Sequence, residues 1–202
     1  VWGETGTLNI LALGEAVVEL GSSNVLLFAG AVMVLVGFFF KVAAVPFHMW
    51  TPDAYQGAAT PVTAFMASAV KAAAFAVLGR FVFMGMVPDL FTSQPVPFVH
   101  VIMALSILTM TVGNLVAIHQ TDAKRMLAWS SISHAGYILL AFVLVPQLGS
   151  GDMALKTVNG SLLFYLAAYG LSTLLAFGAL SRLGGGGSDD ASLNRLSGLS
   201  RT

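Results

Sequence analysis

Length, composition and charge exclude most classes of protein for this chain of 202 residues. Apolar residues make up 57% of it and charged residues only 9%, and its mean hydropathy is +0.86. A soluble domain carries about 25% charged residues because its surface meets water, so this is the composition of an integral membrane protein. The formal net charge is zero and no Lys/Arg cluster alternates with aromatic residues, so nothing supports nucleic-acid binding.

Motifs for cofactors, metals and nucleophilic catalysis are also missing from the sequence. Cysteine is absent, which excludes disulfide frameworks and thiolate metal sites. There is no phosphate-binding loop, dinucleotide fingerprint, G-x-S-x-G or H-E-x-x-H pattern, and the four histidines are scattered singly. We therefore expect neither a bound cofactor nor a metal. The chain begins at Val1 without a signal-peptide pattern, and we expect it to be a piece of a longer one.

Five apolar stretches are long enough to cross a bilayer as helices. Bilayer hydrocarbon is about 30 Å thick and a helix rises 1.5 Å per residue, so a spanning helix needs roughly 20 mostly apolar residues. We predict an all-α, polytopic transmembrane helix bundle of about five spanning helices, its first helix broken near Pro46. The predicted helices cover residues 24–50, 61–87, 98–118, 125–145 and 158–183.

The two ends of the chain differ from this pattern. Residues 1–23 carry three glutamates among apolar residues and are interpreted as the exit of an earlier helix followed by an interfacial loop. Residues 184–202 are polar and glycine-rich, which predicts a flexible loop outside the membrane. The chain is thus divided into a partial transmembrane module, residues 1–183, and this loop.

The distribution of basic residues predicts the orientation of the bundle. If the helices alternate in direction, only Lys156 lies firmly at one end, with Arg80 near it, and five basic residues lie at the other. Cytoplasmic loops carry an excess of Lys and Arg, so the richer end and the glycine-rich tail are predicted to be cytoplasmic. The five residues are Lys124, Arg125, Arg182, Arg195 and Arg201.

Two lysines lie inside predicted helices. Lys41 occurs in VGFFFKVAAVPFH and Lys71 in FMASAVKAAAF, both flanked by apolar residues. A charged side chain at the bilayer centre costs about 2.5 to 3.5 kcal/mol on insertion scales, so a partner, a hydrated cavity or loss of the proton must compensate. Each of these makes the site responsive to charge and water, which favours proton relay, although a lysine that only reaches for the interface stays an alternative for both.

A proline and a histidine follow the first lysine closely. Pro46 removes a backbone hydrogen bond and its ring clashes with the carbonyl of Val42, which predicts a break in the helix. Interrupted helices are common at the ion sites of transporters, and His48 next to this break could carry a proton near neutral pH. A proline kink used only for packing remains the alternative for Pro46, and a hydrogen bond to a neighbouring helix remains the alternative for His48.

The fourth predicted helix carries a second set of candidates. His134 lies in SSISHAGY about nine residues into it, and is either a proton carrier or a helix-to-helix hydrogen-bonding group. The three serines beside it could orient water but could equally serve close helix packing. At its start, HQTDAKR is either a solvated helix cap with a basic pair at the headgroups, or Lys124 is the cytoplasmic mouth of a proton path.

Three long segments resemble a known family. FKVAAVPFHMWTPDAYQGAATPVTAF, HQTDAKRMLAWSSISHAGYILLAF and LLFYLAAYGLSTLLAFGAL are similar, in order, to the subunit N family of the proton-pumping NADH-quinone oxidoreductase, respiratory complex I. This is an antiporter-like subunit of the membrane arm, of which the chain would be a middle piece. Subunits L and M and the multisubunit cation/proton antiporters share the lysine and proline pattern, but WTPDAYQGA followed by PVTAF favours subunit N.

The resemblance implies a function for the buried residues. Lys41 would be a central proton carrier, Lys71 would pass the proton along the membrane arm, and His134 would lie in the connecting polar chain. The chain would be a proton-translocating subunit of the complex in a bacterial inner membrane, bound to other membrane-arm subunits. NADH, flavin, iron-sulfur clusters and quinone would belong to partner subunits. A cation/proton antiporter subunit and a structural scaffold are the alternatives, although intramembrane carboxylates for sodium are missing from the predicted helices.

Overall fold

The computed structural model describes residues 1–20, 24–82, 98–144, 152–183 and 191–193. Within these ranges the regular elements are helices, and an isolated bridge joins Asp122 to Ser192. Five helical spans are long and apolar enough to cross a membrane, which confirms the predicted all-α bundle. They are Val25–Val42, Thr60–Arg80, Val99–Ala117, Ala123–Val143 and Lys156–Leu183.

The first predicted helix, residues 24–50, is interrupted close to the predicted place. Helix α3 (Val25–Val42) starts at Asn24, whose side chain accepts two backbone N–H groups at 3.0 Å, and it ends at Val42. The clash of the Pro46 ring with the carbonyl four residues earlier explains this end, because Val42 is that residue. A short helix, α4 (Trp50–Gly57), follows. The predicted helix 24–50 is therefore two helices separated by turns.

The second span has an irregularity in its middle that the sequence pattern did not predict. It consists of α5 (Thr60–Phe65), the π-helix η1 (Met66–Val70) and α6 (Lys71–Arg80). A π-turn inserts an extra residue into a helix and is frequent at functional sites. The end of the predicted helix, residues 83–87, lies outside the described residues.

The remaining spans are α8 (Phe98–Ala117), α9 (Ala123–Leu144) and α10 (Asp152–Leu183). Helices α8 and α9 approach closely at two glycines. A Cβ atom on Gly113 would lie 2.7 Å from the backbone nitrogen of Ser133, and one on Gly136 would lie 2.7 Å from the side chain of Met110. Small residues let membrane helices pack backbone to backbone in this way.

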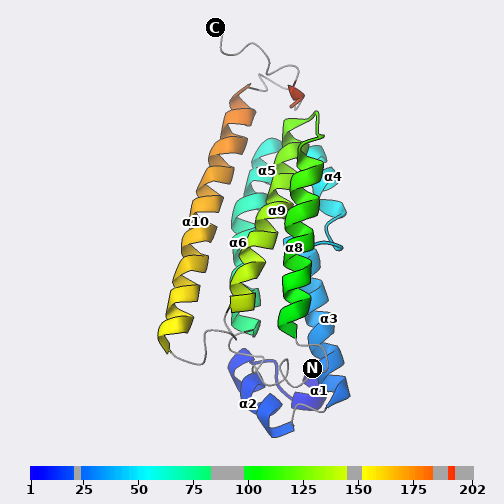
Figure 1. Ribbon diagram of the computed structural model, residues 1–202, viewed down its shortest axis with the longest axis vertical. Helices are drawn as coiled ribbons and strands as arrows, with labels where there is room; N and C mark the ends of the chain where they lie inside the picture. Colours follow the sequence, from blue (N-terminus) through cyan, green and yellow to red (C-terminus); the bar gives the residue numbers. More distant parts are fainter. Residues whose placement is uncertain (21–23, 83–97, 145–151, 184–190, 194–202) are drawn as a thin grey trace.

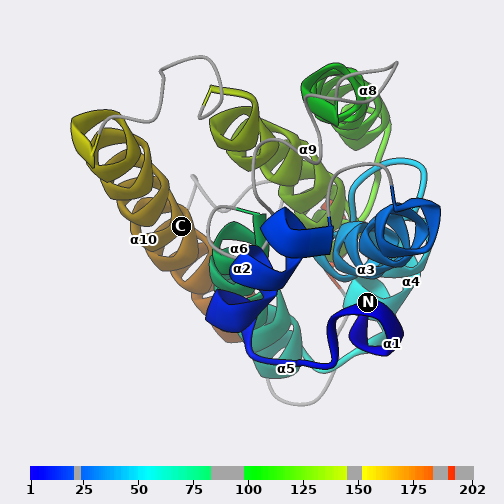
Figure 2. The same cartoon turned by 90° about the horizontal axis from the view of Figure 1, so that it is seen from below.

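The five spans alternate in direction, with α6 near the centre of the bundle and α10 along one flank (Figures 1 and 2). Only 17% of the α10 span is buried, and large apolar side chains such as Phe164 are exposed on it. Exposed apolar surface of this extent is typical of helices that face lipid or further protein.

Both ends of the chain add structure to the bundle. Residues 1–20 form two short helices, α1 (Trp2–Thr5) and α2 (Ile10–Leu20), at the end of the bundle where α6 finishes (Figure 1), where the exit of an earlier helix and an interfacial loop were expected. Residues 191–193 of the tail lie against the start of α9, since the Ala123 amide donates to the Ala191 carbonyl at 2.8 Å. The rest of the predicted loop 184–202 lies outside the described residues.

Candidate functional site

Lys71 is held in the centre of the bundle by one serine of a neighbouring helix. It is the first residue of α6, directly after the π-helix, and only 3% of its surface is exposed. Its Nζ donates to the backbone carbonyl of Ser131 on α9 at 2.7 Å and to the Ser131 hydroxyl at 2.5 Å. The ammonium therefore has two hydrogen-bond acceptors in a setting where an unpaired charge would be costly.

Lys71 also faces the break in the first span. Together with Lys41, on the last turn of α3, it lines a cavity of about 80 Å³, which we call the lysine cavity. Trp50 and Tyr55 of α4 line the same cavity. Lys41 itself is exposed on the described chain. The helix break thus brings two lysines from different helices to one cavity.

Ser131 is shared by more than Lys71. The side chains of Tyr55 on α4 and Tyr169 on α10 also come close enough to interact with its hydroxyl. Tyr55 is only 2% exposed and Ser131 is buried to the same degree. Three helices, α4, α6 and α10, therefore send a polar group to one hydroxyl on α9.

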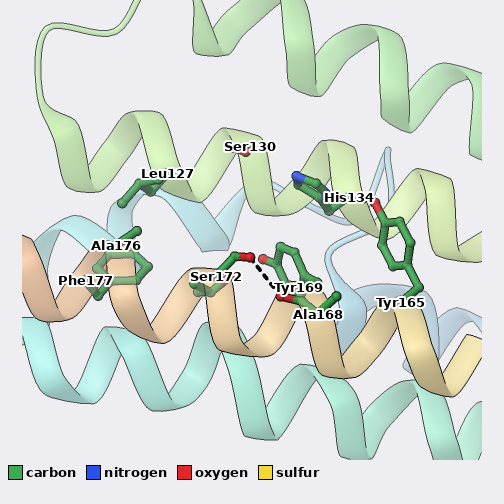
Figure 3. A pocket seen from close by; sticks show the side chains of 10 residues that line it. Leu127, Ser130, His134, Tyr165, Ala168, Tyr169, Ser172, Ala176 and Phe177 are labelled. Carbon is green, nitrogen blue, oxygen red and sulfur yellow. Dashed lines mark hydrogen bonds between the residues drawn. The ribbon is translucent and has the colours of Figure 1, made fainter.

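A larger pocket nearby surrounds His134. It has a volume of about 360 Å³ and lies between α9 and α10 (Figure 3), and we call it the histidine pocket. The His134 Nδ1 lies 2.7 Å from the Tyr165 hydroxyl, and its ring centroid lies 4.8 Å from that of Tyr169. The charge of Lys71 acts on the same histidine. His134 therefore lies within electrostatic range of Lys71.

The broken segment after α3 is held by side chains of its neighbours. The Trp50 indole N–H donates to the Phe40 carbonyl at 3.0 Å, and the Val45 amide donates to the Thr109 hydroxyl at 3.0 Å. These bonds satisfy backbone groups that a continuous helix would pair internally, as the low-dielectric bilayer requires. Pro46 is exposed beside them.

His48 lies in the broken segment between α3 and α4, outside the lining of the lysine cavity. Its ring contacts Trp129 of α9 edge-on, with centroids 5.3 Å apart, and its Nδ1 is buried without a hydrogen-bond partner among the described residues. It does not line the lysine cavity or the histidine pocket.

The start of α9 closes one end of the bundle. Asp122 caps this helix, since its Oδ1 accepts the Arg125 amide at 2.8 Å, as predicted for a cap at this position. Arg125 pairs with Asp53 at 2.6 Å. Lys124 is buried, at 1% exposure, and its Nζ donates to the Ala58 carbonyl at the end of α4 at 2.8 Å. Its side chain is therefore directed into the protein and not to the headgroups.

Within the described ranges, no three His, Asp or Glu side chains come together in a way that could hold a metal ion. The site instead consists of amines, an imidazole and hydroxyls within a helix bundle, groups that exchange protons. All 202 residues match the family described as NADH:quinone oxidoreductase/Mrp antiporter, TM. The chain belongs to this family.

Individual relatives in the NADH:quinone oxidoreductase/Mrp antiporter family cover the chain almost completely. It is 43% identical over 205 residues to NADH-quinone oxidoreductase subunit N 1 of Sorangium cellulosum, matching 100% of this chain and 39% of that protein. In the structure of respiratory complex I from Thermus thermophilus with bound aureothin, one chain superposes with a TM-score of 0.71 at 41% identity, over 99% of this chain and 38% of that one.

A more distant relative belongs to an antiporter. In the structure of the Mrp complex from a Dietzia species, a chain matches with a TM-score of 0.73 at 26% identity, over 90% of this chain and 30% of its own length. The present chain therefore spans less than two fifths of each of these three relatives. The antiporter-like fold is shared by both branches of the family.

The structure distributes the predicted site residues over several places. Lys41 and Lys71 meet at the lysine cavity, and His134 lies in the histidine pocket. Lys124 and His48 line neither space and lie elsewhere on the bundle.

The sequence analysis missed the two tyrosines, Tyr55 and Tyr169, and gave Ser131 little weight. A tyrosine within an apolar span was the available signal for Tyr169, because a buried phenol needs a hydrogen-bond partner.

Proposed function

We propose that this chain is the middle part of a proton-translocating membrane subunit of an NADH-quinone oxidoreductase, and that Lys41, Lys71 and His134 carry the proton. The observation on which the proposal depends is the lysine cavity, which brings two lysines from different helices to one space beside a helix break. A sequence identity of 43% to a subunit N over the whole chain supports the assignment to that complex. The identity to the chain of the Mrp complex is lower, at 26%.

The proposed mechanism is electrostatic. Lys71 lies between the lysine cavity and His134, so a change in charge at Lys41 or at His134 alters the proton affinity of Lys71. Water in the lysine cavity would connect the two amines, since a cavity of about 80 Å³ lined by two amines and a phenol has both room and hydrogen-bonding partners for water. The backbone break at Pro46 keeps this space from being filled by helix.

The remaining parts of the proposal follow from the family and from the distribution of charge. Nicotinamide, flavin, iron-sulfur clusters and quinone would be bound by partner subunits, and the chain would contact other membrane-arm subunits and lipid. The end of the bundle with Lys124 and Arg125 would face the cytoplasm of a bacterium, and buried Lys124 would be the entry of the path from that side.

The test measures quinone-coupled proton pumping in membrane vesicles that carry the full-length parent subunit in its assembled complex. Lys41→Ala and Lys71→Ala are compared with unmodified protein and with Lys156→Ala, which removes an exposed lysine at the start of α10. We expect the Lys41 and Lys71 variants to assemble but pump at least about tenfold more slowly, since a positioned proton-transfer group contributes on the order of 10²–10⁴-fold, whereas Lys156→Ala pumps normally.

Two results would contradict the proposal. Normal pumping in assembled Lys41→Ala and Lys71→Ala complexes would indicate a scaffold whose lysines serve only the topology of the chain. Sodium-dependent proton exchange in vesicles without quinone substrate, abolished by the same substitutions, would assign the chain to the antiporter branch.

A further inference from the structure

One buried hydroxyl, that of Ser131, lies near both the lysine cavity and the histidine pocket. The lysine cavity contains Lys71 and Tyr55, and the histidine pocket contains His134 and Tyr169. The two spaces have no lining residue in common, and Ser131 lines neither of them. Yet Ser131 bonds the lysine of one space and interacts with a tyrosine of each. It is a polar link between them in the described part of the chain.

The hydrogen-bonding capacity of Ser131 is smaller than the number of its neighbours. A serine hydroxyl has one proton to donate and two lone pairs. When Lys71 carries its proton, its ammonium donates to Oγ, so the hydroxyl proton is directed to one of the tyrosines. When Lys71 is neutral, its lone pair can accept that proton instead. The direction of the Ser131 hydroxyl therefore depends on the protonation state of Lys71.

The backbone carbonyl of Ser131 contributes a second, constant bond. It accepts another N–H of Lys71 at 2.7 Å whatever the direction of the hydroxyl. Lys71 consequently stays at Ser131 while the hydroxyl changes partner, and an ammonium, with three donors, keeps one N–H for the lysine cavity. This arrangement holds the amine in place and allows it to exchange a proton on either side.

We propose that Ser131 is the positioning residue that links the lysine cavity to the histidine pocket. It holds Lys71, and its hydroxyl changes hydrogen-bond partner when Lys71 gains or loses a proton. When Lys71 is protonated, the Ser131 hydroxyl donates to a tyrosine. When Lys71 is neutral, the hydroxyl donates to the lysine amine. Ser131 acts through Lys71 and carries no proton of its own in this scheme. The inference deepens the proposed function and depends on it.

Neighbouring Ser133 provides a matched control on the same helix. It is also buried, at 1% exposure, but its hydroxyl has no hydrogen-bond partner among the described residues. Ser133→Ala therefore removes the same atom two positions away without touching Lys71. Ser131→Thr keeps a hydroxyl at the critical position and serves as the conservative variant.

The experiment measures proton pumping and quinone reduction in vesicles carrying the assembled complex with the full-length parent subunit. Displacement of a reacting group by about 1 Å can cost on the order of 10²-fold, so we expect Ser131→Ala to slow pumping about tenfold or more. Ser131→Thr should restore most of the rate and Ser133→Ala should leave it unchanged. A pumping rate for Ser131→Ala equal to that of Ser133→Ala would overturn the inference.

Two further variants keep the inference testable if Ser131→Ala fails to assemble. Tyr55→Phe combined with Tyr169→Phe removes both phenol partners of Ser131 while preserving the rings, and we expect it to slow pumping. Unchanged pumping in this double variant would equally overturn the inference. Lys71→Ala distinguishes failure of the proposed function from failure of the inference about Ser131. If Lys71→Ala pumps normally, the proposed function fails. If Lys71→Ala stops pumping while the Ser131 and tyrosine variants pump normally, only the role of Ser131 fails.

Discussion

The close contact between α8 and α9 provides a quantitative test of the packing around the site. Gly113→Ala would place a Cβ atom 2.7 Å from the backbone nitrogen of Ser133 and 2.9 Å from its Cα. Ordinary contacts of a Cβ begin near 3.4 Å, so the two helices must separate by about 0.7 Å. Because the obstructing atoms are backbone, no side-chain rotation relieves the overlap. Overpacking of this kind typically costs about 1 to 3 kcal/mol.

A second glycine separates this steric cost from helix propensity. Alanine is favoured over glycine in a helix by about 1 kcal/mol, so Gly113→Ala should change stability by about 0 to 2 kcal/mol in the destabilising direction. A Cβ atom on Gly37 of α3 would meet no atom within 4 Å, so Gly37→Ala should gain from helix propensity alone. The two variants should therefore differ by about 1 to 3 kcal/mol.

The assay is equilibrium unfolding of the purified full-length parent subunit in mixed micelles with increasing sodium dodecyl sulfate, followed by circular dichroism. Equal changes in the free energy of unfolding for Gly113→Ala and Gly37→Ala would refute the reasoning, because the contact with Ser133 would then have no energetic consequence. A functional readout accompanies it. Ser131 lies two residues from Ser133, so separation of the helices should also displace Ser131 relative to Lys71 and slow proton pumping.

Two further predictions concern α4. Trp50→Phe should keep the stacking on Phe40, where the centroids are 5.6 Å apart, but lose the indole hydrogen bond to its carbonyl. The same unfolding assay should show a loss of about 0.5 to 1.5 kcal/mol, and an unchanged midpoint would contradict it. The Asp53–Arg125 pair has side chains 74% and 35% exposed, so a double-mutant cycle with Asp53→Asn and Arg125→Met should give a coupling below about 1 kcal/mol that shrinks with added salt. A larger, salt-independent coupling would be inconsistent with this exposure.

Several features of the fold could be predicted because their causes are local in the chain. The membrane class follows from composition, and the spanning helices follow from apolar length against bilayer thickness. The break follows from the clash between the Pro46 ring and a carbonyl four residues earlier, and α3 ends at that residue, Val42. The cap at Asp122 is equally local. The break and the cap depend on neighbours within about one helical turn, and the spanning helices on runs of about 20 residues.

Other features depend on helix rotation, which no local pattern specifies. The π-helix Met66–Val70 adds a residue to its turn and so changes the direction of Lys71 relative to the helix before it. Lys124 looked like a solvated headgroup anchor in one interpretation of the sequence, yet it is buried against the end of α4. Residues 191–193 pair with the start of α9 although they follow a run of glycines. These outcomes depend on contacts between distant segments.

The sequence by itself determined that this protein belongs in a bilayer, that one of its spans is broken, and that Lys41 and Lys71 lie within apolar surroundings. Hydropathy, proline geometry and the cost of burying an amine are properties of short segments and can be read from the order of residues. Only the tertiary structure decided that Tyr55, Lys71 and Tyr169 meet at the hydroxyl of Ser131. They belong to four helices whose rotations are fixed by side-chain packing, and packing acts on all helices at once.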